Sequence, residues 1–422
     1  MIKTIQLAPG VRLHHYPDKR FKKCRLSIQL LRPMCWEEAS KNALIPAVLL
    51  RGTQAYPDMR SITWRLDELY GASVGTAVRR VSNIQTVGFT MTMMDDRFAM
   101  EPEGVLAPGV AFLRELLLNP VTENGVFREE YVESEKKNLI SVIESEINDK
   151  RTYALRRMSE IMCRGDSYEV SRLGRVEDLQ ALTAQSLWQH YRDILRRSPV
   201  ELFYVGSAEA ETVAELLMPI ARELGAEAEK MPGDALFVPQ SEPGEHFEEM
   251  DVNQGNLVMG FTVPITDRDP DYEAMAVLNT LFGAGMTSKL FVNVREKLSL
   301  CYFAGSTYYR TRGIMSVSAG IDECNYERAK EEILHQLECC ARGEITREEL
   351  EAAKKSMCAS LTAVPDSPGS LEGYYTPDLM RGVCSTPDGF IAGVKAVTVE
   401  DLVRCAGKIR LHTVYFLKGE SK

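Results

Sequence analysis

The sequence predicts a mixed α/β fold made of two similar halves. Short runs rich in β-branched and apolar residues alternate with longer runs that carry apolar residues at i, i+3 and i+4 spacing. The first pattern is typical of strands and the second of amphipathic helices. The order of these runs in the first half of the chain recurs in the second half, which indicates a duplicated unit.

The individual elements follow from these two patterns, taken in chain order. The first half contains two predicted strands and then two predicted helices, at 25–31, 86–94, 109–118 and 128–145. The second half alternates strand, helix, strand and helix, at 256–263, 271–281, 313–321 and 325–340. Each strand range is enriched in β-branched or apolar residues, and each helix range has apolar residues spaced for one face.

Two helix-then-strand units support the duplication. Thr183 precedes a helical run and then a predicted strand at 200–205, and Thr398 precedes a helical run and then a predicted strand at 413–417. Threonine is a favoured N-cap, and Thr398 followed by Asp401 resembles a capping box. The two units lie about 215 residues apart in a chain of 422. Because helix–strand units are common, coincidence is an alternative explanation of this echo.

The domain boundary is predicted between the two halves. The stretch 231–244 carries three prolines and two glycines, which disfavour helix interiors and central strands. We therefore predict an N-terminal domain at 1–230, a linker at 231–244 and a C-terminal domain at 245–422.

Charge and composition exclude several classes of partner. The formal net charge of −10 argues against nucleic acid or an anionic membrane, because both require clustered Lys and Arg. The chain has no run of about 18 apolar residues that would span a membrane, and its first residues lack the apolar run of a signal peptide. The ten cysteines show no CxxC spacing. We expect a cytoplasmic protein with reduced, mostly buried thiols.

Common catalytic motifs are absent from the sequence. It contains neither a phosphate-binding loop, nor a GxSxG elbow, nor HExxH or HxxEH. Of the six histidines only His14 and His15 are close together, and neighbours on a strand point to opposite faces. No nucleophile–base pair is visible either, which disfavours an independent enzyme with other chemistry.

One stretch of the second half is distinctive. Residues 279–303 contain a glycine-rich turn, a small hydroxyl residue, a basic residue before Leu-Phe, an Arg-Glu-Lys triplet and a later tyrosine, at Gly283, Gly285, Ser288, Lys289, Arg295 and Tyr302. This order resembles the C-terminal half of the M16 peptidases, the insulinase and mitochondrial-processing-peptidase family. Weaker matches to the first half of that family lie at Gly10–Leu13, Leu173-Gly174, Leu182-Thr183 and Val205-Gly206. The resemblance therefore covers nearly the whole chain.

The first half departs from the family at its zinc helix. In the family, HxxEH lies at a fixed distance before a Gly-Thr pair, which here is Gly52-Thr53. Counting back places Ala43 and Ala47 at the two histidine positions and Pro46 at the position of the general-base glutamate. Proline also lacks the backbone N–H that a helix interior uses.

The third ligand of the family is also missing. That ligand is a glutamate seven residues after another glutamate, and the same step from Glu135 ends on Val142. Glu144 and Glu146 lie nearby, so this part of the alignment has an alternative. One carboxylate without imidazoles does not hold a catalytic zinc ion. The resemblance thus implies no metal and no cofactor in this chain, with zinc supplied by a partner.

What remains is the part of the site that binds substrate. The resemblance implies that Arg295 and Tyr302 hydrogen-bond substrate carbonyls near the scissile bond, because Arg and Tyr offer fixed donors for an oxyanion. It further implies substrate binding by the preceding turn, at Gly283, Gly285, Met286 and Ser288. Spacing alone favours another explanation, in which residues 295–297 are a solvated helix end and Tyr302 is a core aromatic of a strand at 301–306.

The resemblance also implies an architecture and a function. The fold would be two homologous halves that face each other across a cavity, each a mostly antiparallel sheet with helices on one face. The chain most resembles inactive members that are encoded beside zinc-bearing partners in Gram-positive bacteria, including those associated with elongation-factor-P modification or with maturation of ribosomally made peptides. It would then be the non-catalytic subunit of a heterodimeric zinc peptidase, inactive alone, that acts on unfolded peptides with an HxxEH-bearing partner. The alternative is a structural or peptide-binding protein without a catalytic role.

Overall fold

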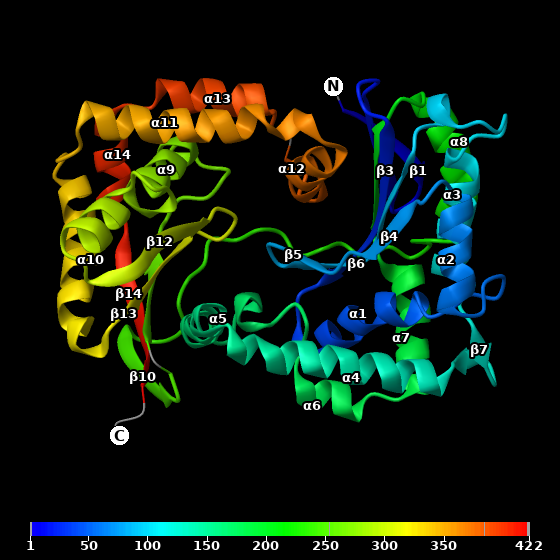
Figure 1. The fold of residues 1–422 in the computed structure, drawn as a ribbon, viewed down its shortest axis with the longest axis horizontal. Helices are drawn as coiled ribbons and strands as arrows, with labels where there is room; N and C mark the ends of the chain where they lie inside the picture. The colour runs from blue at the N-terminus through cyan, green and yellow to red at the C-terminus, as the bar shows by residue number, and fades with distance from the viewer. Residues whose placement is uncertain (1, 253, 384, 420–422) are drawn as a thin grey trace. The chain divides into compact units, whose positions relative to one another are not determined.

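The computed structural model describes residues 2–252, 254–383 and 385–419, and it confirms the mixed α/β class (Figure 1). The chain divides into two compact units. The first contains residues up to 144, residues 170–233 and residues 365–383. The second contains residues 145–169, 234–364 and 385 onward, and each unit is built around its own sheet.

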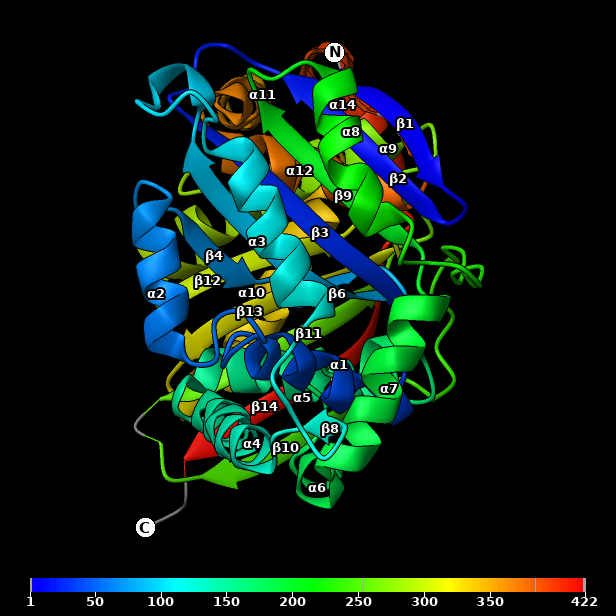
Figure 2. The same ribbon diagram turned by 90° about the vertical axis from the view of Figure 1, so that its right-hand side faces the viewer.

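The sheet of the first unit is mostly antiparallel. Its strand order is β1-β2-β9-β3-β6-β4, with β5 also paired to β6, and only β2 and β9 run parallel (Figure 2). The bounds are β1 (Lys3–Ala8), β2 (Val11–Pro17), β3 (Lys23–Pro33), β4 (Ser73–Thr76), β5 (Arg79–Val81), β6 (Ile84–Met94) and β9 (Val200–Gly206). A separate two-stranded ribbon is formed by β7 (Thr122–Glu123) and β8 (Val126–Phe127).

The two faces of this sheet are covered by different helices. Along β3, Leu26, Ile28 and Leu30 enter the main hydrophobic core, while the alternate residue Gln29 bonds to Glu372 of α12 on the other face. Figures 1 and 2 show α3 and α8 on one side and α12 on the other. The helices are α1 (Trp36–Leu49), α2 (Met59–Glu68), α3 (Leu106–Leu118), α4 (Glu129–Ser145), α6 (Val176–Ala181), α7 (Ala184–Arg197), α8 (Ala210–Ala221) and α12 (Pro368–Met380).

The second unit repeats this plan. Its sheet has the order β10-β14-β11-β13-β12, with only β10 and β14 parallel. The bounds are β10 (Gly244–Met250), β11 (Gly255–Thr262), β12 (Cys301–Tyr309), β13 (Ile314–Ile321) and β14 (Arg410–Gly419). When the five strands are numbered by their position along the chain, their order across the sheet is first, last, second, fourth, third. The strands β2-β9-β3-β6-β4 of the first unit lie in the same order. The shared order confirms two similar halves.

The helices of the second unit also lie on two faces. Leu257 and Phe261 of β11 enter the main core, while the alternate residue Val258 packs with Met158 of α5. The bounds are α5 (Lys150–Met162), α9 (Tyr272–Asn279), α10 (Tyr326–Ala341), α11 (Arg347–Thr362), α13 (Pro387–Ala396) and α14 (Val399–Ala406). Two π-helical segments follow α9, η4 (Thr280–Ala284) and η5 (Leu290–Lys297).

The predicted capping residues are confirmed in both halves. Thr183 begins α7 and Thr398 begins α14, and each forms a capping box with the residue three positions on. Each of these helices precedes the last strand of its sheet, β9 or β14. The helix-then-strand pattern that recurs in the sequence therefore corresponds to a repeated structural unit.

The units are not the continuous stretches 1–230 and 245–422 that the sequence analysis expects. Helix α5 belongs to the second unit, and α12 belongs to the first. The reason is that the apolar periodicity of a helix reveals its buried face but not which sheet that face covers. The expected linker at 231–244 carries no helix or strand before β10 begins at Gly244, although Phe237 within it is buried and its N–H donates to the Arg312 carbonyl at 2.8 Å.

Candidate functional site

The structure brings together the residues aligned with the zinc site of the M16 family. Ala43 and Ala47 on α1 line the same pocket as Glu135 and Val142 on α4. The pocket has a volume of about 330 Å³ and lies within the first unit. The alignment made from the sequence therefore corresponds to one location in the fold, and neither Glu144 nor Glu146 lines it.

The residues of this pocket do not fit a zinc ion. Ala43, Ala47 and Val142 offer no metal-binding side-chain atom, whereas a catalytic zinc needs three protein ligands. The single carboxylate, Glu135, is already engaged. Its Oε1 accepts from Arg51 Nη1 at 3.2 Å and its Oε2 accepts from Asn138 Nδ2 at 3.1 Å.

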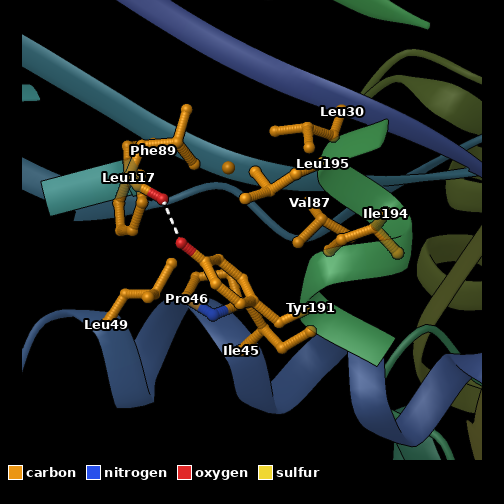
Figure 3. A pocket seen from close by; sticks show the side chains of 11 residues that line it. Leu30, Ile45, Pro46, Leu49, Val87, Phe89, Leu117, Tyr191, Ile194 and Leu195 are labelled. Atoms are coloured by element: carbon orange, nitrogen blue, oxygen red, sulfur yellow. Dashed lines mark hydrogen bonds between the residues drawn. The ribbon is translucent and has the colours of Figure 1, made fainter. Parts of the chain in front are cut away.

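Pro46, which lies between Ala43 and Ala47 on α1, does not line this pocket. It is buried and lines a small apolar cavity in the core, together with Leu30, Phe89 and Tyr191 (Figure 3). The Tyr191 hydroxyl donates to the Leu117 carbonyl at 2.8 Å, so the polar atom of this cavity has its partner. The position aligned with the general base is thus part of the packed interior.

Arg295 and Tyr302, predicted from the sequence, share a second pocket. It has a volume of about 380 Å³ and lies within the second unit. Arg295 comes from η5 and Tyr302 from β12. The other lining residues are Glu296, Ser299, Leu300, Cys301 and Asp322.

A β-bulge explains why Tyr302 is accessible. The pairing of β12 with β13 passes from Cys301–Ile321 to Phe303–Gly320, so Tyr302 is the extra residue. Bulges at sheet edges re-aim side chains, and β12 is the last strand of its sheet. Tyr302 is 64% exposed, so the alternative of a core aromatic is wrong. The ring of Phe303 instead lies over Gly320, where a Cβ would come within 2.5 Å of it.

Arg295 is fixed by two neighbours on η5. Its Nη1 pairs with Glu296 Oε1 at 3.2 Å, and its guanidinium lies 4.7 Å from the centre of the Phe291 ring. The chain then turns through Ser299, whose φ of 49° lies in the left-handed region. Burial raises the pKa of the Cys301 thiol to about 11, so this cysteine is a neutral thiol at neutral pH and not a nucleophile.

The four residues of the predicted binding turn have different surroundings. Gly283 is buried, and a Cβ there would lie 2.5 Å from Ser306 Oγ. Ser288 is buried and its Oγ accepts from the Phe291 N–H at 3.3 Å. Gly285 is half-buried, whereas Met286 is 78% exposed. None of the four lines the pocket of Arg295 and Tyr302, and their role in binding stays a prediction.

Two charged lining residues were missed by the sequence analysis. Asp322 follows β13 and reaches the pocket of Arg295 because β13 pairs with β12. Arg172 lines the pocket of Ala43 and Glu135. The strand pairing that places Asp322 is a long-range feature. Arg172 directly precedes the weak match at Leu173-Gly174, which assigns no role to the arginine.

Comparison with known proteins relates the chain to one family. Residues 181–357 match the family described as "Peptidase M16 inactive domain". A protein of Bacillus subtilis (strain 168) described as "Probable inactive metalloprotease YmfF" is 30% identical over 414 residues, which cover 97% of this chain and 96% of that protein. The "Uncharacterized zinc protease YmxG" of the same organism is 26% identical over 231 residues, covering 54% of this chain and 55% of that protein.

Solved structures show the same fold. A conserved protein from Enterococcus faecalis V583 has a TM-score of 0.93 at 29% identity, with 100% of this chain and 99% of that chain covered. A protease from Helicobacter pylori has a TM-score of 0.81 at 16% identity, with 99% of each chain covered. The second likeness concerns the fold alone.

Proposed function

The chain belongs to the M16 peptidase family as an inactive member, and on this premise we propose that it is the non-catalytic subunit of a zinc peptidase. A partner chain with HxxEH supplies the zinc and the general base. The observation that carries the proposal is the contrast between two pockets of this chain. One has alanine and valine at the ligand positions, while the other presents Arg295 and an exposed Tyr302 together.

The chemistry of the second pocket suits a peptide carbonyl. Attack on an amide places negative charge on the carbonyl oxygen, and donors aimed at that oxygen stabilise the transition state. Arg295 offers several N–H donors with a permanent charge, and Tyr302 offers one O–H on a rigid ring. In the assembled peptidase these two side chains bind the substrate carbonyl beside the partner's metal.

The substrate we propose is an unfolded peptide. Tyr302 lies on β12, an edge strand, and an extended peptide that adds to such an edge gains main-chain hydrogen bonds with little demand on sequence.

Within the described residues no helix is long and apolar enough to cross a membrane. We also propose a cytoplasmic location for the heterodimer, with neither a membrane nor nucleic acid as its partner.

Co-expression with an HxxEH-bearing relative of similar length tests the proposal. We expect this chain alone to lack peptidase activity and the purified pair to cleave an unstructured fluorogenic peptide. Arg295→Ala and Tyr302→Phe should each lower the turnover of the pair by about 100-fold, the usual loss for one oxyanion donor. Size-exclusion chromatography should show the pair intact in both variants.

Two matched substitutions serve as controls. Arg328→Ala changes an exposed arginine on α10, and Tyr309→Phe removes a hydroxyl from the other end of β12. Both should leave turnover within about twofold of the parent. If Arg295→Ala and Tyr302→Phe also retain full turnover, the shared site is wrong and the chain is a structural or peptide-binding subunit.

A further inference from the structure

The pocket aligned with the zinc site has the features of a binding site even though it does not fit a metal. Its volume of about 330 Å³ lies within the usual range for small-ligand sites, roughly 300–1,000 Å³. Most of its wall is apolar, from α1, α4 and the segments around them, at Ala43, Leu44, Ala47, Val78, Leu139, Val142 and Leu173. Such a wall favours an apolar side chain.

The charges around this pocket do not cancel. Glu135 is balanced by Arg51 at 3.2 Å. The remaining cation is Arg172, which is exposed, and no described residue forms a hydrogen bond or an ion pair with its side chain. An arginine without a partner at the wall of an apolar pocket is complementary to a carboxylate.

The loop that carries Arg172 is firmly held. The Arg172 carbonyl accepts from Gln85 Nε2 at 2.7 Å, which ties the loop to β6. Two residues on, Gly174 has a φ of +76° and approaches α1 so closely that a Cβ would lie 1.9 Å from Ser40 Oγ. The cation is therefore presented from a fixed backbone, which lowers the entropic cost of binding.

We propose that this pocket binds the carboxy-terminal residue of a peptide whose last side chain is apolar. The side chain fills the apolar cavity, and the terminal carboxylate pairs with Arg172. An α-carboxylate lies next to its own side chain, so one residue satisfies both features, whereas an aspartate or glutamate side chain does not. Thr76 of the edge strand β4 also lines the pocket, so the peptide backbone has a strand beside it.

Fluorescence anisotropy on the purified chain tests this inference without any partner subunit. The probes are fluorescein-labelled alanine tetrapeptides extended by a final leucine, as the free acid and as the amide. We expect the acid to bind at least about 10-fold more tightly than the amide, because only the acid forms a charge-assisted pair. Replacing the final leucine by lysine should also abolish binding.

Variants assign the binding to this pocket. Arg172→Gln should lower the affinity for the acid by about 10-fold, so that the acid and the amide bind with equal affinity. Because Arg172 is exposed, the substitution should leave the stability of the fold nearly unchanged. Ala47→Phe should block binding by filling the cavity. Arg192→Gln, an exposed arginine on α7, should change nothing.

Three results would overturn the inference. They are equal affinity for acid and amide, unchanged affinity in Arg172→Gln, and no binding to the parent chain. Because Arg295 and Tyr302 take no part in this measurement, failure here leaves the proposed peptidase function untouched, and failure of that function leaves this pocket untouched.

Discussion

His190 on α7 is held as a neutral imidazole inside the first unit. Its Nε2–H donates to Asn42 Oδ1 at 2.7 Å, and Asn42 in turn donates to Gln85 Oε1 at 2.9 Å. Burial lowers the pKa of His190 to about 4, with Lys41 and Arg32 acting in the same direction and Glu38 opposing them. The unfolded chain returns this histidine to its ordinary pKa near 6.5.

The resulting prediction concerns stability against acid. Between about pH 6.5 and 4 the unfolded state binds a proton at His190 that the folded state does not, so stability falls as the pH falls through this window. We expect the parent to lose about 1–2 kcal/mol from this group between pH 7 and 5. His190→Gln should remove that part of the pH dependence, as measured by urea denaturation at both pH values. An unchanged pH dependence in His190→Gln would contradict the assignment.

At the scale of elements, the contact between α5 and β11 depends on a missing side chain. A Cβ on Gly260 would lie 2.6 Å from the sulfur atoms of both Met158 and Met162. The absence of a side chain at Gly260 therefore leaves room for the two methionine side chains, which pack α5 against the sheet.

We predict that Gly260→Ala destabilises the protein by about 1–3 kcal/mol through overpacking. Gly373→Ala on α12 is the matched control, because nothing lies within 4 Å of the added Cβ. Alanine at that exposed helical position should stabilise the protein by about 0.5–1 kcal/mol. Opposite signs in thermal melting of the two variants are expected, and equal signs would contradict the packing argument.

Local patterns in the sequence were enough to predict part of the helices and strands. The strands predicted at 25–31 and 86–94 lie within β3 and β6, and the helix at 109–118 lies within α3. The helix predicted at 128–145 begins one residue before α4. Thr183 and Thr398 could be identified because an N-cap acts within one turn of its own helix. Arg295 and Tyr302 could be named because their spacing along the chain resembles a known pattern.

Other features depend on contacts between distant segments. The bulge at Tyr302 requires the register of β12 against β13, and Asp322 enters the pocket only through that pairing. Arg172 reaches its pocket through a loop tied to β6 by Gln85. Local hydrophobic periodicity predicts neither the register of two paired strands nor the position of a loop.

At the scale of the whole molecule, buried charged groups stabilise the packing of α12 against the sheet of the first unit. Glu372 is 1% exposed. Its carboxylate accepts from Arg79 Nη1 at 2.9 Å and from Gln29 Nε2 at 3.0 Å, and Arg25 lies 3.6 Å away. Removing one partner of such a buried pair leaves an uncompensated charge.

We therefore predict that a fragment of residues 1–230 does not form a stable unit. It would expose the polar face of its sheet, leave Arg25 and Arg79 without Glu372, and carry α5 without its sheet. Circular dichroism should show a lower and broader melting transition than in the full chain. A synthetic peptide of residues 365–383 should raise that transition, and a peptide with Glu372→Gln should raise it less. A fragment that melts as cooperatively as the full chain would contradict this prediction.

The placement of α12 also constrains how the protein is made. A ribosome synthesises the chain from its N-terminus, so the segments of the first unit up to residue 144 and at 170–233 emerge long before residues 365–383, which complete that unit. Until α12 emerges, the polar face around Gln29 lacks its cover. We therefore expect the first unit to finish folding only near the end of translation, rather than as an early independent domain.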